Sequence, residues 1–119
     1  MDKKKNLGKL GELIAFYYLE KRSYIILEKN WKFKHLEVDI IASFKGELVF
    51  FEIKTNLNFL FPPEENLKRK QVKNLKKAMQ CYCRLNFFDV ENCRLDLIVI
   101  NLNNHLKLKK MFHYKNIIF

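Results

Sequence analysis

Glycine and proline are scarce in this sequence. Its 119 residues include only three Gly and two Pro, whereas 49% are hydrophobic and 14% are aromatic. The chain contains no low-complexity tract, no repeat and no long linker. We therefore expect residues 1–119 to form a single compact domain with one core.

Cysteine is also rare and lacks the spacing of a metal site. Cys81, Cys83 and Cys93 make an odd number, form no CxxC pair and have no nearby histidine at zinc-binding spacing. This pattern indicates neither a disulfide framework nor a structural metal site. Reduced thiols in the cytoplasm are the expected state.

No long uncharged hydrophobic run is present either. The sequence opens with a basic segment, and the apolar stretch that follows is interrupted or bounded by Glu12, Glu20, Lys21 and Arg22. A signal peptide or a membrane-spanning helix needs an uncharged apolar segment. The sequence therefore predicts a cytoplasmic protein without a membrane partner.

Acidic residues are outnumbered by basic ones. There are 13 Asp and Glu against 23 Lys and Arg, which gives a formal net charge of +10. A dense basic cluster spans residues 68–77, with Lys68, Arg69, Lys73, Lys76 and Lys77. Lysine and arginine release counterions when they neutralise phosphates, so this charge favours a polyanionic partner. A solvated lysine-rich surface is the simpler alternative.

Hydrophobic periodicity predicts two helices and five strands. Apolar residues recur at helical spacing over residues 7–22 and 67–85. β-Branched and aromatic residues predict strands at residues 24–31, 37–43, 47–54, 94–101 and 105–112. The turn-prone Asn103–Asn104 pair lies near the junction of the last two strands. This order, αβββαββ, is typical of an α/β fold with a mixed sheet flanked by helices.

Four charged residues interrupt the two most apolar strands. If Lys45–Gly46 forms the hairpin turn, Asp39 faces Glu52, and their Cβ atoms lie about 4.5–5.5 Å apart. The same register places Glu37 opposite Lys54 on the same face of the sheet. The other face carries the core residues Val38, Ile40, Val49, Phe51 and Ile53. One face is thus expected to pack and the other to perform chemistry.

Two facing carboxylates can share a divalent ion. Mg²⁺ prefers oxygen ligands and is often held by one or two carboxylates, waters and substrate phosphate. Such an ion polarises the scissile phosphate and activates water, and Lys54 is placed to orient that water or stabilise developing negative charge. The alternative is structural: a salt bridge between Glu37 and Lys54, and another between Asp39 and a second base.

The sequence also resembles a known family. Asp39, followed on the next strand by Glu52, Ile53 and Lys54, resembles the PD-(D/E)XK motif of restriction-endonuclease-like nucleases. A wider set of segments is similar to successive blocks of the YraN family of small endonuclease-like bacterial proteins and covers nearly the whole chain. These segments are GKLGELIAFYYL, YIILEKNW, LEVDIIA, GELVFFEIKT, Lys70, residues 78–82 and RLDLIVI.

The resemblance implies a fold and a set of site residues. The fold is a restriction-endonuclease-like core in which three antiparallel strands are followed by a crossover helix and a parallel strand. Glu12 resembles the N-terminal glutamate of archaeal Holliday-junction resolvases, which makes it a metal ligand or a neighbour of one. Glu37 is implied as a supporting acid, and Lys70 and Gln71 as substrate contacts. We also expect the carbonyl of Ile53 to be a third oxygen ligand.

Three positions depart from the usual family pattern. Leu36 replaces a glycine, Asn56 replaces an arginine, and Leu95 replaces a phenylalanine. Loss of the arginine weakens an expected phosphate contact. None of the three changes removes a proposed metal ligand or Lys54.

These observations predict a nuclease that uses Mg²⁺, with Mn²⁺ as an alternative ion, to hydrolyse phosphodiester bonds of DNA rather than RNA, in a branched or damaged form. The first alternative is a nucleic-acid-binding module that retains the nuclease fold without cutting. The second is a scaffold protein whose basic helix binds an acidic protein.

Resolvases of this fold often work as dimers, and the apolar first helix would permit a homodimer. Arg94 and Asp96 are expected to form a structural ion pair, and the three histidines to be structural or on the surface.

Overall fold

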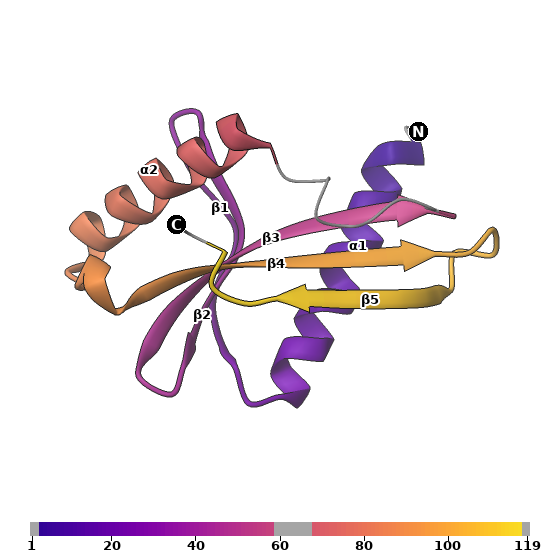
Figure 1. Ribbon diagram of the computed structural model, residues 1–119, viewed down its shortest axis with the longest axis horizontal. Coiled ribbons are helices and arrows are strands. Elements are labelled where there is room, and N and C mark those ends of the chain that lie inside the picture. Colours follow the sequence, from indigo (N-terminus) through magenta and orange to yellow (C-terminus); the bar gives the residue numbers. More distant parts are fainter. Residues whose placement is uncertain (1–2, 59–67, 118–119) are drawn as a thin grey trace.

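The computed structural model describes residues 3–58 and 68–117 of the chain (Figure 1). The elements are α1 (Lys3–Lys21), β1 (Ile25–Phe33), β2 (Leu36–Phe44), β3 (Glu47–Leu57), α2 (Arg69–Asn86), the short 3₁₀ helix η2 (Val90–Asn92), β4 (Cys93–Leu102) and β5 (Leu108–Tyr114). The predicted αβββαββ order is confirmed, with η2 as an addition. Within the described ranges, no helix is long and apolar enough to cross a bilayer.

The five strands form one mixed sheet in the order β1-β2-β3-β4-β5. Strand β2 is antiparallel to both β1 and β3, β4 joins β3 in parallel, and β5 returns antiparallel to β4. Because parallel strands cannot be joined by a hairpin, the chain crosses from β3 to β4 through α2. This is the α/β arrangement expected from the sequence.

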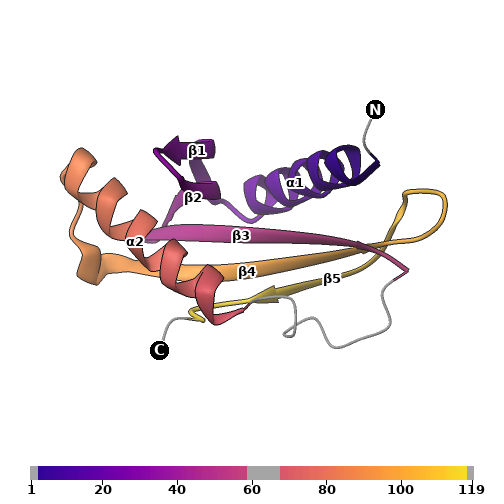
Figure 2. The ribbon, with the colours of Figure 1, turned by 90° about the horizontal axis from the view of Figure 1, so that it is seen from above.

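The two helices cover opposite faces of the sheet (Figure 2). Ala15 and Leu19 of α1 pack against a core that includes Phe51. Leu75 of α2 and its apolar neighbours pack against a second core that includes Phe50. Both faces of β3 are therefore buried, and the prediction that one face serves only chemistry was wrong.

The hairpin between β2 and β3 has the expected turn. Lys45 and Gly46 have φ values of 48° and 82°, and two successive positive φ values are typical of a type I′ turn. The ladder runs from the pair Phe44–Glu47 to the pair Ile40–Phe51. The register predicted from the turn is confirmed over this part of the hairpin.

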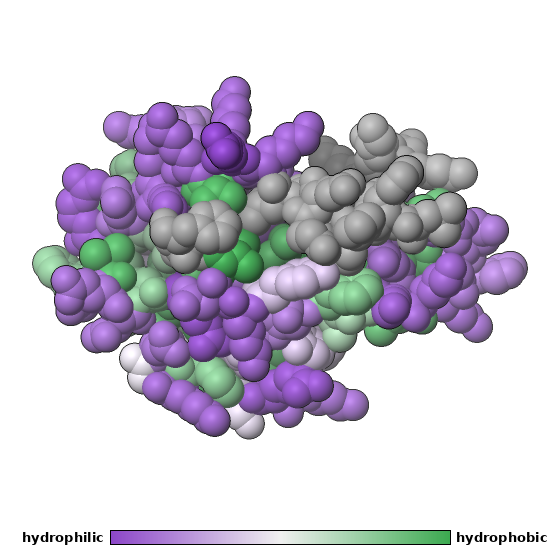
Figure 3. Space-filling model, in the orientation of Figure 1, coloured by the Kyte–Doolittle hydropathy of each residue, from purple (hydrophilic) through white to green (hydrophobic). Residues whose placement is uncertain are grey.

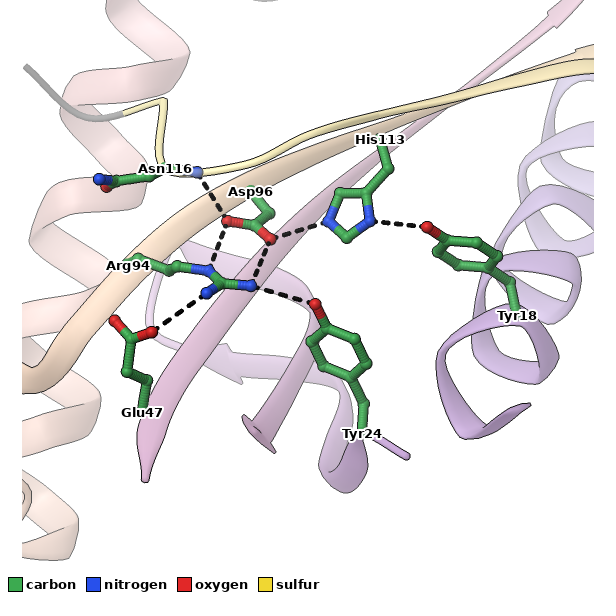
Figure 4. Close-up of polar contacts among 7 residues, drawn as sticks. All are labelled: Tyr18, Tyr24, Glu47, Arg94, Asp96, His113 and Asn116. Atoms are coloured by element: carbon green, nitrogen blue, oxygen red, sulfur yellow. Dashed lines mark hydrogen bonds and ion pairs between the residues drawn. The ribbon is translucent and has the colours of Figure 1, made fainter. Parts of the chain in front are cut away.

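A buried ion pair lies at the start of β4 (Figure 4). The Arg94 Nε atom lies 3.1 Å from Oδ1 of the fully buried Asp96. Arg94 also donates to Glu47 at 3.1 Å and to the Tyr24 hydroxyl at 3.0 Å. The predicted pairing of Arg94 with Asp96 is confirmed.

The same carboxylate fastens the C-terminal strand. Asp96 lies 2.8 Å from Nε2 of His113 and accepts a hydrogen bond from the Asn116 backbone N–H at 2.9 Å. The other ring nitrogen of His113 lies 2.9 Å from the Tyr18 hydroxyl of α1 (Figure 4). Burial alone would raise the pKa of Asp96, but its bonds with His113, Asn116 and Arg94 lower it below the usual value.

The last strand begins later than predicted. Its first residue is Leu108, because the side chain of Asn103 accepts hydrogen bonds from the backbone N–H groups of His105 and Lys107. Leu106 between them has a φ of 58°. Asparagine side chains often stabilise turns in this way. The loop around Asn103 therefore takes up residues assigned to the strand by sequence.

Candidate functional site

Strand β2 changes face at Asp39. Val38 packs in the core beneath α2, whereas Ile40 packs in the core beneath α1. Residues two apart in a regular strand share a face, so β2 must twist between them. Asn30 in the neighbouring strand β1 has a φ of 53°, a value that asparagine tolerates better than most residues. The distortion at Asn30 and Asp39 centres on the predicted site.

The Asp39 carboxylate points toward β3 within the sheet. Its Oδ2 atom accepts a hydrogen bond from the backbone N–H of Ile53 at 2.7 Å. The regular β2–β3 ladder ends one pair earlier, at Ile40–Phe51. Asp39 and Glu52 are therefore neighbours at the point where the strands diverge, rather than members of a regular ladder pair.

The same geometry bears on the carbonyl of Ile53. In an extended strand, the N–H and C=O groups of one residue point toward the same neighbouring strand. Since the N–H of Ile53 points to Asp39, its carbonyl also faces the side of β2. This orientation suits the predicted role of that oxygen as a ligand beside Asp39.

Glu52 and Lys54 lie on the side of the sheet that α2 covers. They alternate along β3 with Phe51 and Ile53, which belong to the core beneath α1. Burial, the negative charge of Asp39 and a hydrogen bond with Asp39 together raise the pKa of Glu52 to about 9, whereas Lys54 opposes this shift. At neutral pH the metal-free site therefore retains a proton on Glu52.

A glycine in α1 brings the third carboxylate close to β3. A side chain at position 11 would collide with Oγ1 of Thr55. Only glycine at this position therefore lets α1 approach β3 so closely. Glu12, the next residue, then borders a recess shared with Asp39 and Asn30. The structure thus brings the predicted Glu12 to the site.

Glu12 responds to the other acids electrostatically. Burial raises its pKa, the charge of Asp39 raises it further, and a hydrogen bond from Asn30 lowers it. Lys9 and Lys29 also line the recess. Glu12, Asp39 and these two lysines therefore meet at the recess, and Glu12 acts on Glu52 through its charge.

Glu37 lies outside this centre. It pairs with Lys32 across the β1–β2 ladder, and their charged atoms are 3.7 Å apart in an exposed position. The predicted pairing of Glu37 with Lys54 was wrong, because the twist at Asp39 ends the regular alternation on which it rested. Glu37 acts on the site through its charge, which is the smallest of the effects that raise the pKa of Glu12.

The donor set fits a hard divalent cation such as Mg²⁺. Asp39 and Glu52 provide neighbouring carboxylates, and Mg²⁺ commonly uses one or two of these together with waters and substrate phosphate. Among residues 3–58 and 68–117, no three His, Cys, Asp or Glu side chains form a ready-made metal cage. Glu12 is therefore a more distant acid at this site rather than part of a closed three-carboxylate cage.

Helix α2 presents the predicted basic surface. Lys73 and Lys77 are exposed, and neither forms an ion pair within the parts of the chain that the structure describes. At the start of the helix, the Oε1 atom of Gln71 accepts the backbone N–H of Lys68 at 3.1 Å. Gln71 thus has a structural role that the sequence did not predict. The remaining predicted contacts also belong to this segment: Arg69 and Lys70 are exposed, and Lys76 is half-buried.

Residues 11–100 match the sequence model of the uncharacterised protein family UPF0102, also called the YraN family. The chain belongs to the UPF0102 family. The match spans the acidic cluster formed by Glu12, Asp39 and Glu52, the whole of α2 and most of β4. The resemblance drawn from the sequence blocks is thereby confirmed, and Glu12, Asp39, Glu52 and Lys54 all lie within it.

Individual UPF0102 proteins match along most of their length. A UPF0102 protein of Caldanaerobacter subterraneus subsp. tengcongensis is 43% identical over 95% of this chain and 94% of its own. Others from Flavobacterium johnsoniae and Bacteroides thetaiotaomicron are 42% and 40% identical, covering 82% and 86% of this chain and 82% and 85% of theirs. These UPF0102 relatives share the whole domain rather than a motif.

Sequence reasoning missed Gly11 and Asn30 as parts of the site. A glycine directly before the candidate Glu12 was a usable signal, because a helical glycine often marks a close approach. Asn30 carried a weaker signal, since asparagine tolerates positive φ but occurs in many other contexts. Lys9 and Lys29 offered none, because their position in the recess depends on how α1 crosses β1.

Proposed function

We propose that the protein is a divalent-metal-dependent nuclease that hydrolyses phosphodiester bonds of DNA. One observation carries the proposal: the charges of Asp39, Lys54 and Glu12 all act on Glu52, and the pKa of Glu52 is raised to about 9. Carboxylates with strongly shifted pKa values cluster at functional sites. A purely structural site would be more stable without a second acid beside Glu52.

The chain's own side chains divide the chemistry. Bound Mg²⁺ or Mn²⁺ would supply Lewis-acid polarisation of the scissile phosphate and activation of water. Asp39, Glu52 and the carbonyl of Ile53 would hold that ion, while Glu12 orders its surroundings. Lys54, whose charge already acts on Glu52, would stabilise the negative charge that develops on the phosphate.

The basic start of α2 supports phosphate as the partner. Lys68, Arg69 and Lys70 are exposed there, and the first turn contains no acidic residue. The N-terminal end of a helix dipole is positive, so it repels the cations beside it. A bound anion would relieve this repulsion. DNA backbone phosphates are anions of the right kind and number for the longer basic surface.

A cleavage assay on the purified full chain tests the proposal. Labelled blunt duplex, forked duplex, four-way junction and single-stranded DNA would be incubated with Mg²⁺, with Mn²⁺ or with EDTA, beside a matched RNA duplex. We expect metal-dependent cleavage of at least one DNA form and none in EDTA. Binding without cleavage of any form would reject the nuclease.

The second candidate is a nucleic-acid-binding module that does not cut. It is favoured by the lack of a ready-made three-residue metal cage among the described residues. It also accounts for the exposed cations of α2 without any chemistry at Asp39. The two functions differ in whether Mg²⁺ binds, which isothermal titration of the protein with Mg²⁺ alone measures directly.

The basic surface of α2 yields a binding prediction. Reversing Lys73 and Lys77 to glutamate should weaken binding to every DNA sequence and flatten its dependence on salt, because both side chains reach phosphates rather than bases. Fluorescence anisotropy at several salt concentrations measures both quantities. Reversal of Lys107 in the β4–β5 loop and of Lys109 in β5, both of which are exposed, changes the net charge equally and serves as the control. Equal losses in the two variants would mean that net charge, not α2, determines binding.

A further inference from the structure

Helix α2 ends on a phenylalanine in an unusual conformation. Phe87 has φ 59° and ψ 38°, and its side chain is 96% exposed. The left-handed conformation ends the helix by directing the N–H groups of Phe87 and Phe88 to the carbonyl of Cys83. Glycine normally occupies this position, because other side chains are strained there. Neither helix capping nor core packing explains a phenylalanine at this place.

The adjacent Phe88 shows what a structural residue looks like here. Its ring stacks on Tyr82, with centroids 6.1 Å apart and planes 11° from parallel. Phe88 is 44% exposed and is held by this stack on Tyr82, which belongs to the core beneath α2. Phe87 instead projects into solvent. At the end of α2, the ring of Phe88 is therefore packed and the ring of Phe87 is free to contact a ligand.

A polar stripe runs along α2 and ends one turn before Phe87. Lys73, Lys77, Gln80 and Arg84 are exposed and recur every three or four residues, which places them on one side of the helix. From Lys73 to Arg84 the helix rises about 16 Å, which is the length of about five nucleotides of one DNA strand. In Figure 3 the surface over α2 is mainly hydrophilic, and hydrophobic surface emerges near the end of the helix.

We infer that Phe87 is a stacking platform for an unpaired base, and that the protein therefore binds DNA where a duplex opens into a single strand. This inference rests on the proposed function, since it takes DNA as the partner. Proteins that hold single-stranded nucleic acid combine a positively charged surface with aromatic side chains on which bases stack. In a fully paired duplex no base face is free, so the ring adds nothing to duplex binding.

The variant Phe87→Gly separates binding from stability. It removes the ring and supplies the residue that the left-handed position favours, so the melting temperature should rise by a few degrees. Affinity for a forked duplex with single-stranded arms should fall about tenfold, while affinity for a blunt duplex stays unchanged. Fluorescence anisotropy in EDTA measures both affinities without cleavage.

Three further variants sharpen the comparison. Leu106 is also apolar, 52% exposed and left-handed with a φ of 58°, but it lies in the β4–β5 loop. Leu106→Gly therefore relieves the same strain and should leave both affinities unchanged. Phe87→Trp should retain binding to the fork, whereas Phe87→Leu should lose it, because only the aromatic ring stacks.

Each outcome bears on a different claim. If the wild type binds the fork and Phe87→Gly binds it equally well, the stacking inference is wrong and the proposed function stands. If the wild type binds no DNA form, both fail. If sedimentation shows that Phe87→Gly converts a dimer to a monomer, the exposed ring contacts a second copy of the chain, and that result also overturns the inference.

Discussion

Asp39→Asn is expected to abolish Mg²⁺-dependent DNA cleavage and to leave DNA binding intact or slightly improved. The change removes the charge of a proposed metal ligand with little change in volume. The asparagine oxygen can still accept the N–H of Ile53, so the contact between β2 and β3 survives. We expect a loss in rate on the order of a thousandfold, measured under single-turnover conditions on the preferred DNA form.

Two variants give this experiment its contrast. Lys54→Ala should also lose cleavage but retain Mg²⁺ binding, because Lys54 acts on the substrate's charge rather than on the ion. Glu37→Gln removes an equal charge at an exposed site paired with Lys32, and it should retain most of the activity. If Asp39→Asn cleaves as fast as Glu37→Gln, the acidic cluster is not catalytic.

Glu52→Gln is expected to stabilise the metal-free protein at neutral and higher pH. The pKa of Glu52 is raised from 4.5 to about 9 on folding. Between these values the folded state binds the proton more tightly than the unfolded state, so the free energy of unfolding falls as pH rises. A neutral glutamine has no such dependence. At pH 7 the free energy of unfolding should rise by at most about 3 kcal/mol, because pH 7 lies about 2.5 units above the unfolded-state pKa of Glu52.

Denaturant unfolding in EDTA at several pH values between 5 and 9 measures this difference. The wild-type protein should lose stability toward pH 9, and the curve of Glu52→Gln should be flatter. Added Mg²⁺ should stabilise the wild type more than the variant, because the ion replaces the proton on Glu52. Parallel pH curves for the two proteins in EDTA would show that Glu52 is ionised in the folded state.

The turn and the ion pair were predictable because their signals are local. Lys45–Gly46 fixes the hairpin by its own backbone preferences, and the register follows from the turn. Arg94 and Asp96 are two residues apart on one strand, so their side chains share a face. The element order followed from periodicity in the same way. In these cases the sequence positions alone determine which groups meet.

The twist at Asp39 was not predictable from alternation. Strand periodicity assumes a regular backbone, and a single distortion reverses every later assignment of face. The covering of both faces did have a signal: Ile41, Leu48 and Phe50 are apolar on the side assigned to chemistry, and strands buried on both faces read as continuous apolar runs. Glu12 reached the site only through its family resemblance, because its proximity depends on how α1 crosses the sheet.

The parallel pairing of β3 with β4 also sets an order of assembly. Leu48 pairs with Cys93, so this ladder closes a loop that contains the whole of α2. The hairpin that brings Asp39 to Ile53 closes only a short turn. Closing a longer loop costs more chain entropy, and non-local strand pairing is slow. We expect the acidic residues of the hairpin to meet while still hydrated, and the crossover to limit the rate of refolding.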